Sequence, residues 1–402
     1  MEARSKLREY LSKGNVKQLN KLLKDFPPRA VAQRVNEELE PNGTTPLIFC
    51  AKALKESDGD EEEDYVECCL VLIKNGANVR AKTTEGHTAL HWAVSCSTSN
   101  LAAILLSAGA DPKQKDQNGI NALQVAIKDG SADNVKVILD KRPQLADERD
   151  EFGMPPVILA LQQYQEDIVR HLVEAGADVN IQEARNLRTP LHYALYTKKL
   201  KILEFLLGHN PDLTKTDHRG TTIVHRSSAI RDKQYLEAVV RLSKSPPGTL
   251  WRMADEEGNT AVMLACQNDN YDQLVILLEQ GATVSDHDKY GRTALHHCVE
   301  NTDTECAELL LKTDTSLLNT PDKEGLTPLH MAAITGNSNL LRLLLKKGAN
   351  LTCRDQEGHT VVHWATVTGH TECLEILIEH DADLSTPRQA QSVPHPLCCS
   401  DS

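Results

Sequence analysis

Six histidines are the first residues in this 402-residue sequence whose chemistry invites a functional interpretation. Histidine binds transition metals and exchanges protons near neutral pH, so a group of histidines could form a metal or catalytic site. All six recur at one position of a repeated segment, which would space them about 10 Å apart along a stack of helices instead of around one ion. We therefore interpret the following residues as structural: His91, His192, His225, His296, His330 and His363.

Cysteine and histidine together could also suggest zinc. His296, His297 and Cys298 are consecutive, but neighbouring residues of one helix point in different directions, and no second pair follows at zinc-binding spacing. The eleven cysteines form no Cys-x-x-Cys pair, which favours free, buried thiols in a reducing compartment. We predict no metal ion and no cofactor.

Motifs for catalysis are missing from the sequence. A nucleophilic serine or cysteine needs a nearby base and a third group that orients the base. The sequence contains no Gly-x-Ser-x-Gly, no Gly-x-x-x-x-Gly-Lys phosphate loop and no kinase motif set. We predict that the chain is not an enzyme.

An acidic run extends from Ser57 to Asp64. Asp58 and Asp60 alternate as in a calcium loop, but the glycine and the terminal glutamate that such a loop requires are not at the needed offsets. A solvated, mobile loop is the favoured interpretation. Because Asp60 follows three residues after Ser57, we note Ser57 as a candidate for phosphorylation by an acidophilic kinase.

The elements that would carry these residues are set by a recurring segment, Gly-x-Thr-Pro-Leu-His. Clear copies begin at Gly86, Gly291, Gly325 and Gly358, and most intervals between copies are 33 or 34 residues. Each copy continues with an apolar, alanine-bearing segment, a break, a leucine pair and Gly-Ala, which predicts two short amphipathic helices. The threonine position of the ten copies is occupied by Thr45, Thr88, Asn121, Pro155, Thr189, Thr222, Thr260, Thr293, Thr327 and Thr360.

This repeat length and this motif resemble those of the ankyrin repeat. The resemblance implies an all-α solenoid of stacked helix-turn-helix units with projecting β-hairpin turns, in which the repeated histidine ties neighbouring turns together. The residues agree with it: threonine can cap a helix that begins with proline, and an Asp-x-x-Gly turn such as Asp322 to Gly325 suits a hairpin tip. Two departures are Leu187 in place of the turn glycine and a 38-residue interval before Thr260.

Three segments follow from the extent of the repeats. Residues 1–40 have a helix-turn-helix rhythm without the repeated motif and are interpreted as a capping helix pair. Residues 41–384 form the solenoid, with the acidic loop inserted at 55–65. Residues 385–402 are rich in proline and polar residues, which predicts a disordered tail.

Composition limits the partners and the compartment. The net charge is −13 and no basic stripe is interleaved with aromatic residues, which argues against nucleic acid as the partner. No run of eighteen apolar residues exists, so we expect no membrane insertion. We expect an intracellular monomer, placed in the cytoplasm, with the nucleus and the cilium as alternatives.

The positions that the repeat does not dictate are the best candidates for binding a partner. These are the hairpin tips and the exposed side of the first helices. Aromatic and arginine side chains are typical anchors of protein interfaces. We therefore predict a concave partner-binding surface that includes Phe152, Arg188, Tyr196, Arg219 and Tyr290.

Two further predictions depend on the resemblance. The segment from Leu172 to Asn180 is similar to the hairpin sequence that an ankyrin-directed asparaginyl hydroxylase modifies, so Asn180 is a candidate for hydroxylation. Trp92 and Trp364 follow the repeated histidine, at a position that should face the helix core. The sequence His-Trp-Ala at both sites is similar to that in repeats of inversin-like ciliary and polarity scaffolds.

The sequence therefore predicts a non-catalytic scaffold or adaptor that binds a protein partner. An alternative is the substrate-targeting subunit of a larger enzyme complex, such as a ubiquitin ligase or a phosphatase. A distant alternative is a ciliary or polarity scaffold like inversin.

Overall fold

Helices account for the regular elements in the part of the chain that the computed structural model describes, residues 2–57, 62–96, 99–243, 249–301, 303–380 and 382. Within these residues no strand forms, and one isolated β-bridge joins Ala254 to Thr260. The hairpin turns that we expected therefore project without becoming strands. The chain divides into two compact units, Met1–His218 and Arg219–Ser402.

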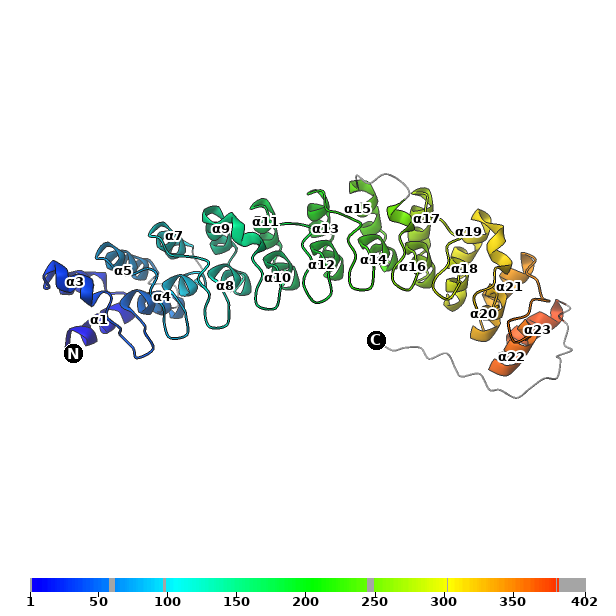
Figure 1. Ribbon diagram of the computed structural model, residues 1–402, viewed down its shortest axis with the longest axis horizontal. Helices are drawn as coiled ribbons and strands as arrows, with labels where there is room; N and C mark the ends of the chain where they lie inside the picture. Colours follow the sequence, from blue (N-terminus) through cyan, green and yellow to red (C-terminus); the bar gives the residue numbers. More distant parts are fainter. Residues whose placement is uncertain are drawn as a thin grey trace. The chain divides into compact units, whose positions relative to one another are not determined.

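The N-terminal unit is a stack of helix pairs (Figure 1). In its regular repeats a short inner helix follows each hairpin turn, and an outer helix runs back beside it. Its helices are α1 (Glu2–Ser12), α2 (Val16–Lys24), α3 (Pro28–Arg34), α4 (Pro46–Glu56), α5 (Glu62–Lys74), α6 (Ala89–Ala93), α7 (Asn100–Ser107), α8 (Ala122–Lys128), α9 (Ala132–Lys141), the 3-10 helix η1 (Pro143–Asp147), α10 (Pro156–Gln162), α11 (Glu166–Glu174), α12 (Pro190–Tyr196) and α13 (Leu200–Leu207).

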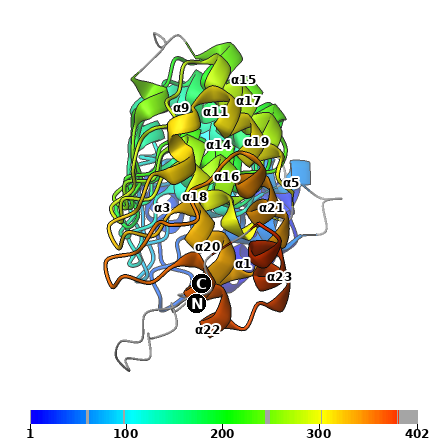
Figure 2. The same cartoon turned by 90° about the vertical axis from the view of Figure 1, so that its right-hand side faces the viewer.

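The C-terminal unit repeats the same plan. Figure 2 shows its turns, yellow to orange, projecting together from one side of its helices. Its helices are α14 (Ile223–Ala229), α15 (Gln234–Leu242), the 3-10 helix η2 (Leu250–Arg252), α16 (Ala261–Gln267), α17 (Tyr271–Glu279), α18 (Ala294–His297), the 3-10 helix η3 (Cys298–Glu300), α19 (Glu305–Thr313), the 3-10 helix η4 (Thr315–Asn319), α20 (Pro328–Thr335), α21 (Ser338–Lys346), α22 (Val361–Thr368) and α23 (Thr371–Glu379).

The repeated threonine and histidine cap the inner helices. At α18 the backbone N–H of Thr293 donates to Nδ1 of His296 at 3.0 Å. Because Nδ1 accepts a proton there, Nε2 carries the ring proton, and it donates to the carbonyl of Leu326 in the next repeat at 3.1 Å. His91 and His225 make the same bond to the next repeat, which confirms that the histidine ties neighbouring turns together.

Each hairpin turn is closed by an aspartate and joined to its neighbour. Asp322 accepts hydrogen bonds from the backbone N–H groups of Glu324 and Leu326, each at 2.9 Å. The N–H of Lys323 donates to the carbonyl of Tyr290 in the preceding turn at 2.9 Å. The turns are therefore a hydrogen-bonded row within the unit, with little freedom to move singly.

A second row of bonds lies where the inner helix of a repeat passes into the outer helix. The side-chain amide of Asn301 donates to the carbonyl of Cys266 at 2.8 Å, and that of Asn337 donates to Val299 at 2.9 Å. Asn134 makes the equivalent bond to Val94 in the N-terminal unit. These asparagines satisfy carbonyls that end the preceding inner helix, a role that we did not infer from the sequence.

We expect Gly325→Ala to destabilise the C-terminal unit more than Gly348→Ala. Both glycines have positive φ, +81° and +88°, so each alanine costs about 1–2 kcal/mol of backbone strain. A Cβ on Gly325 would also lie 2.9 Å from the backbone nitrogen of Gln356, whereas one on Gly348 meets no atom within 4 Å. Urea denaturation of both variants measures the difference. Equal losses would show that the turns do not pack as rigidly as their hydrogen bonds indicate.

The structure changes the expected segments in two places. Residues 1–40 contain three helices instead of a pair, because α3 follows α2. The expected acidic loop at 55–65 is shorter: α4 continues to Glu56, and α5 begins at Glu62, where three acidic residues in its first turn favour the positive end of the helix dipole. Residues 58–61 and the tail at 385–402 lie outside the described residues.

Trp92 and Trp364 were wrongly expected to fill the helix core. Both side chains are only half-buried. The indole N–H of Trp364 donates to the carboxylate of Asp355 at 2.9 Å, and the ammonium groups of Lys52 and Lys55 lie 5.7 Å from the ring of Trp92. Both rings therefore lie beside polar groups instead of filling the core, although only the indole N–H of Trp364 has a hydrogen-bond partner and that of Trp92 is buried without one.

Candidate protein-binding surface

Two of the predicted anchors are among the most exposed aromatic side chains of the N-terminal unit. Phe152 stands at the tip of the turn before α10 and is 86% exposed. Tyr196, the last residue of α12, is 76% exposed. Rings of this size normally lose most of their exposure on folding, so the pair marks a surface that offers apolar area to another molecule.

Arg188 lies between the turn and the inner helix, half-buried. In the inner helix that follows, the hydroxyl of Tyr193 accepts a hydrogen bond from the amide of Gln162, 3.4 Å away at the end of α10. Burial raises the pKa of Tyr193, so the hydroxyl stays protonated at neutral pH. The hydrogen bond between Gln162 and Tyr193 joins the end of α10 to α12.

Leu187 belongs to this surface, although we interpreted it only as an irregular turn residue. It replaces the turn glycine, adopts φ +55° and leaves 46% of its side chain exposed. A left-handed conformation costs a non-glycine residue about 1–2 kcal/mol. The loss of the glycine was visible in the sequence, but the exposure and conformation of the leucine were not.

The other two predicted anchors belong to the C-terminal unit. Tyr290 is 49% exposed at a turn, and its ring lies 5.0 Å from the ammonium of Lys289 and 5.2 Å from the guanidinium of Arg292. Arg219 is exposed at the first turn, and its carbonyl accepts from the N–H of Glu256. Phe152, Arg188 and Tyr196 thus share one unit, and Arg219 and Tyr290 share the other.

The two candidate modification sites have structural contacts. The hydroxyl of Ser57 donates to the carbonyl of Leu54 at 2.8 Å, at the end of α4. The side-chain oxygen of Asn180 accepts from the backbone N–H of Asp212 in the next repeat at 2.6 Å. Asn180 therefore helps to hold two turns together, and its modification remains a prediction, as does that of Ser57.

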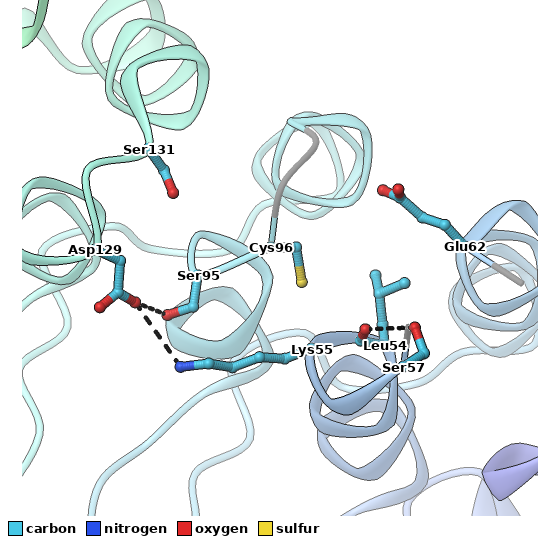
Figure 3. Close-up of a pocket in the computed structure, with 8 residues that line it drawn as sticks. All are labelled: Leu54, Lys55, Ser57, Glu62, Ser95, Cys96, Asp129 and Ser131. Atoms are coloured by element: carbon cyan, nitrogen blue, oxygen red, sulfur yellow. Dashed lines mark hydrogen bonds and ion pairs between the residues drawn. The ribbon is translucent and has the colours of Figure 1, made fainter. Parts of the chain in front are cut away.

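A polar pocket of about 310 Å³ lies where α4, α6 and α8 pass into the following outer helices (Figure 3). The hydroxyl of Ser95 and the ammonium of Lys55 both approach one carboxylate oxygen of Asp129, at 2.5 and 3.8 Å. Burial raises the pKa of the Cys96 thiol to about 11, so it remains protonated at neutral pH. The pocket thus does not present an activated cysteine nucleophile.

The structure gives the repeated histidines no partner set for a metal. Among the described residues, no group of three histidine, cysteine or acidic side chains could hold an ion. Burial lowers the pKa of His91 and His330, in keeping with neutral rings used as caps. None of the helices described is both long enough and apolar enough to cross a membrane.

Comparison with protein families gives a match along most of the chain. The model of the family described as Ankyrin repeats (3 copies) matches residues 10–116, 54–146, 100–183, 123–217, 227–319 and 313–388. These ranges include Phe152, Arg188, Tyr196 and Tyr290, whereas Arg219 lies in the gap between residues 217 and 227.

Among curated proteins, the chain is similar to larger proteins of different kinds. It is 27% identical over 258 residues to the Nuclear factor NF-kappa-B p105 subunit of Gallus gallus, covering 60% of this chain and 26% of that protein. The mouse p105 subunit (Mus musculus) is 28% identical over 57% of this chain and 25% of its own length. The human (Homo sapiens) Transient receptor potential cation channel subfamily A member 1 is 24% identical over 54% and 16%.

Among the solved structures that are similar is that of the ankyrin repeat domain of Bcl-3, described as a unique member of the IkappaB protein family. Its TM-score is 0.48 at 26% identity, and the match covers 57% of this chain and 100% of that one. By length, the chain spans about a quarter of the p105 relatives and less of the channel.

Proposed function

Because the chain belongs to the ankyrin-repeat family, we propose that it is a non-catalytic scaffold or adaptor that holds a protein partner on its hairpin and inner-helix surface. Ankyrin repeats generally mediate interactions between proteins. The observation that carries the proposal is the exposure of Phe152 and Tyr196 in a unit whose other large apolar residues are mostly buried. Burying such rings against a partner would release them from water.

The rigidity of the turns supports this role. A surface that is already ordered loses little conformational entropy on binding, so more of the contact energy is available as affinity. Bonds between neighbouring turns and the Gln162–Tyr193 hydrogen bond order this surface before any partner arrives. The turn that presents Tyr290 in the C-terminal unit is a second candidate contact, since its ring combines apolar area with two nearby cations.

We place the scaffold in the cytoplasm. The cysteines of the described residues are free, and all of them except Cys353 are buried. Free thiols are typical of proteins in a reducing compartment.

Changing Phe152, Arg188 and Tyr196 together to alanine is expected to abolish partner recovery. Anchors at the centre of an interface contribute about 2 kcal/mol or more each, so the affinity should fall more than a hundredfold even with partial additivity. The tagged full chain would be used to purify partners from cytosol, followed by quantitative mass spectrometry of wild type and variant.

A matched control changes Tyr271 and Arg142 to alanine. Both residues are exposed, but Tyr271 begins the outer helix α17 and Arg142 follows the end of the outer helix α9. This control should retain its partners. If the triple variant keeps the same partners at the same level, the proposed surface is wrong. If subunits of a ubiquitin ligase or a phosphatase are recovered with wild type but not with the triple variant, this chain is instead the substrate-targeting subunit of that enzyme.

A further inference from the structure

Charge changes sign between two neighbouring repeats of the N-terminal unit. Residues 151–183 contain one basic and six acidic residues, whereas residues 184–218 contain six basic and three acidic residues. The second segment includes the turn with Leu187 and the inner helix that ends at Tyr196. The basic segment therefore contains two of the exposed apolar residues, Leu187 and Tyr196, in a chain whose net charge is −13. One of its cations, Lys199, pairs with Glu166 of the acidic repeat at 3.3 Å.

The turn itself directs its acidic residue inward and its arginines outward. Glu183 is buried, and its two carboxylate oxygens accept from the backbone N–H groups of Arg185 and Asn186, each at 2.6 Å. Arg185 is exposed and Arg188 is half-buried. Within the described residues neither arginine takes part in a salt bridge, so their positive charges are available to a ligand.

Leu187 lies between these arginines in the strained left-handed conformation that Gly86, Gly119 and Gly153 adopt in the preceding turns. The turn does not need a leucine, since glycine adopts the same conformation without strain. Here the turn presents an apolar side chain flanked by two guanidinium groups.

We infer that this surface binds an acidic linear peptide segment of a partner protein that also carries an apolar side chain. This inference rests on the proposed function and specifies the partner's chemistry. Carboxylates of the peptide pair with Arg185 and Arg188, where a planar guanidinium can bind a carboxylate through two hydrogen bonds. The apolar side chain packs against Leu187, which is 46% exposed.

A short peptide fits better than a nucleic acid. At physiological ionic strength, charges separated by more than about 8 Å are largely screened. A peptide of a few residues therefore responds to the two arginines alone. A nucleic acid long enough to extend past this turn would also meet the acidic repeat at residues 151–183 and the net charge of −13.

Selection from a random 12-residue peptide library displayed on phage, with the immobilised full chain as target, tests the inference. The recovered peptides should be enriched in aspartate and glutamate combined with a large apolar residue. The most enriched peptide, synthesised with a fluorescent label, should bind the double variant Arg185→Glu, Arg188→Glu at least tenfold more weakly in fluorescence polarisation. The control Lys136→Glu, Lys141→Glu makes the same change in charge on the outer helix α9, at exposed positions, and should bind within twofold of wild type.

Circular dichroism verifies that the double glutamate variant and its lysine control are folded. If the double glutamate variant does not fold, the variant Arg185→Gln, Arg188→Gln replaces it, and its affinity for the peptide should be at least fivefold weaker than that of wild type. Failure to recover acidic peptides, or equal weakening in the control, overturns the inference. Apolar peptides without acidic residues that are lost in the Phe152, Arg188, Tyr196 triple alanine variant would retain the proposed function and reject the acidic class. A last outcome is that acidic peptides require the two arginines for binding, but cytosolic partners bind the triple alanine variant as well as they bind wild type. This result would support the peptide site and reject the proposed scaffold surface.

Discussion

Trp251→Ala is expected to destabilise the C-terminal unit by about 3–5 kcal/mol, because it removes a large side chain from a closely packed site and leaves a cavity. Trp251 is 2% exposed in the 3-10 helix η2 and is the largest fully buried side chain in the described part of the chain. Urea denaturation gives the free energy of unfolding. Hydrogen exchange should show the loss of protection concentrated in α15, α16 and α17, since each repeat contacts mainly its neighbours.

Two variants separate cavity formation from a general effect of losing tryptophan. Trp364→Ala removes a half-buried ring and its bond to Asp355, and should cost less than half as much. Trp251→Leu should recover part of the loss, because Leu318 occupies the corresponding place in η4. Equal losses for Trp251→Ala and Trp364→Ala would contradict the burial that separates the two sites.

Acid is expected to destabilise the C-terminal unit through His296. Burial lowers the pKa of this histidine to about 4, whereas an unfolded histidine titrates near 6.5. Its Nδ1 also accepts the N–H of Thr293, so a proton there would remove the cap. The stabilising contribution is complete above about pH 6.5 and is lost as the pH falls towards 4, by at most about 3 kcal/mol.

His296→Gln tests this dependence with a replacement that the chain itself uses. Gln124 occupies the histidine position of its repeat, and its side-chain oxygen accepts the N–H of Asn121 at 2.9 Å. The variant should lose about 1 kcal/mol at pH 7 because the bond to Leu326 is weakened or absent, but it should lose less than wild type on acidification. Denaturation curves at pH 7 and pH 4.5 measure both effects. Parallel losses in the two proteins would show that His296 does not titrate as its burial predicts.

Much of the fold was predictable because the repeated residues act locally. Thr293 and His296 are three residues apart and cap one helix, and Asp322 and Gly325 close one turn. Such contacts are encoded by spacing along the chain, so ten copies of one motif were enough to predict them. The asparagine row was harder to predict, because Asn301 and its acceptor Cys266 are 35 residues apart.

The candidate binding surface was predicted in part. Phe152 and Tyr196 occupy positions that the repeat leaves free, and both proved to be exposed. The role of Leu187 was missed, because only the folded turn shows that its side chain points to solvent from a left-handed backbone. Trp92 and Trp364 were misplaced, since a motif position does not state how far a large ring extends beyond the small residues around it.

By itself, the sequence determined that this protein is a stack of ankyrin repeats and that its repeated histidines are structural. Local spacing suffices for that, because each repeat uses the same short-range caps and turns. Only the tertiary structure decided which side chains remain open to a partner. Exposure depends on how neighbouring repeats, some 33 residues away, pack on each residue; Phe152 and Tyr196 remain exposed whereas Glu183 is buried.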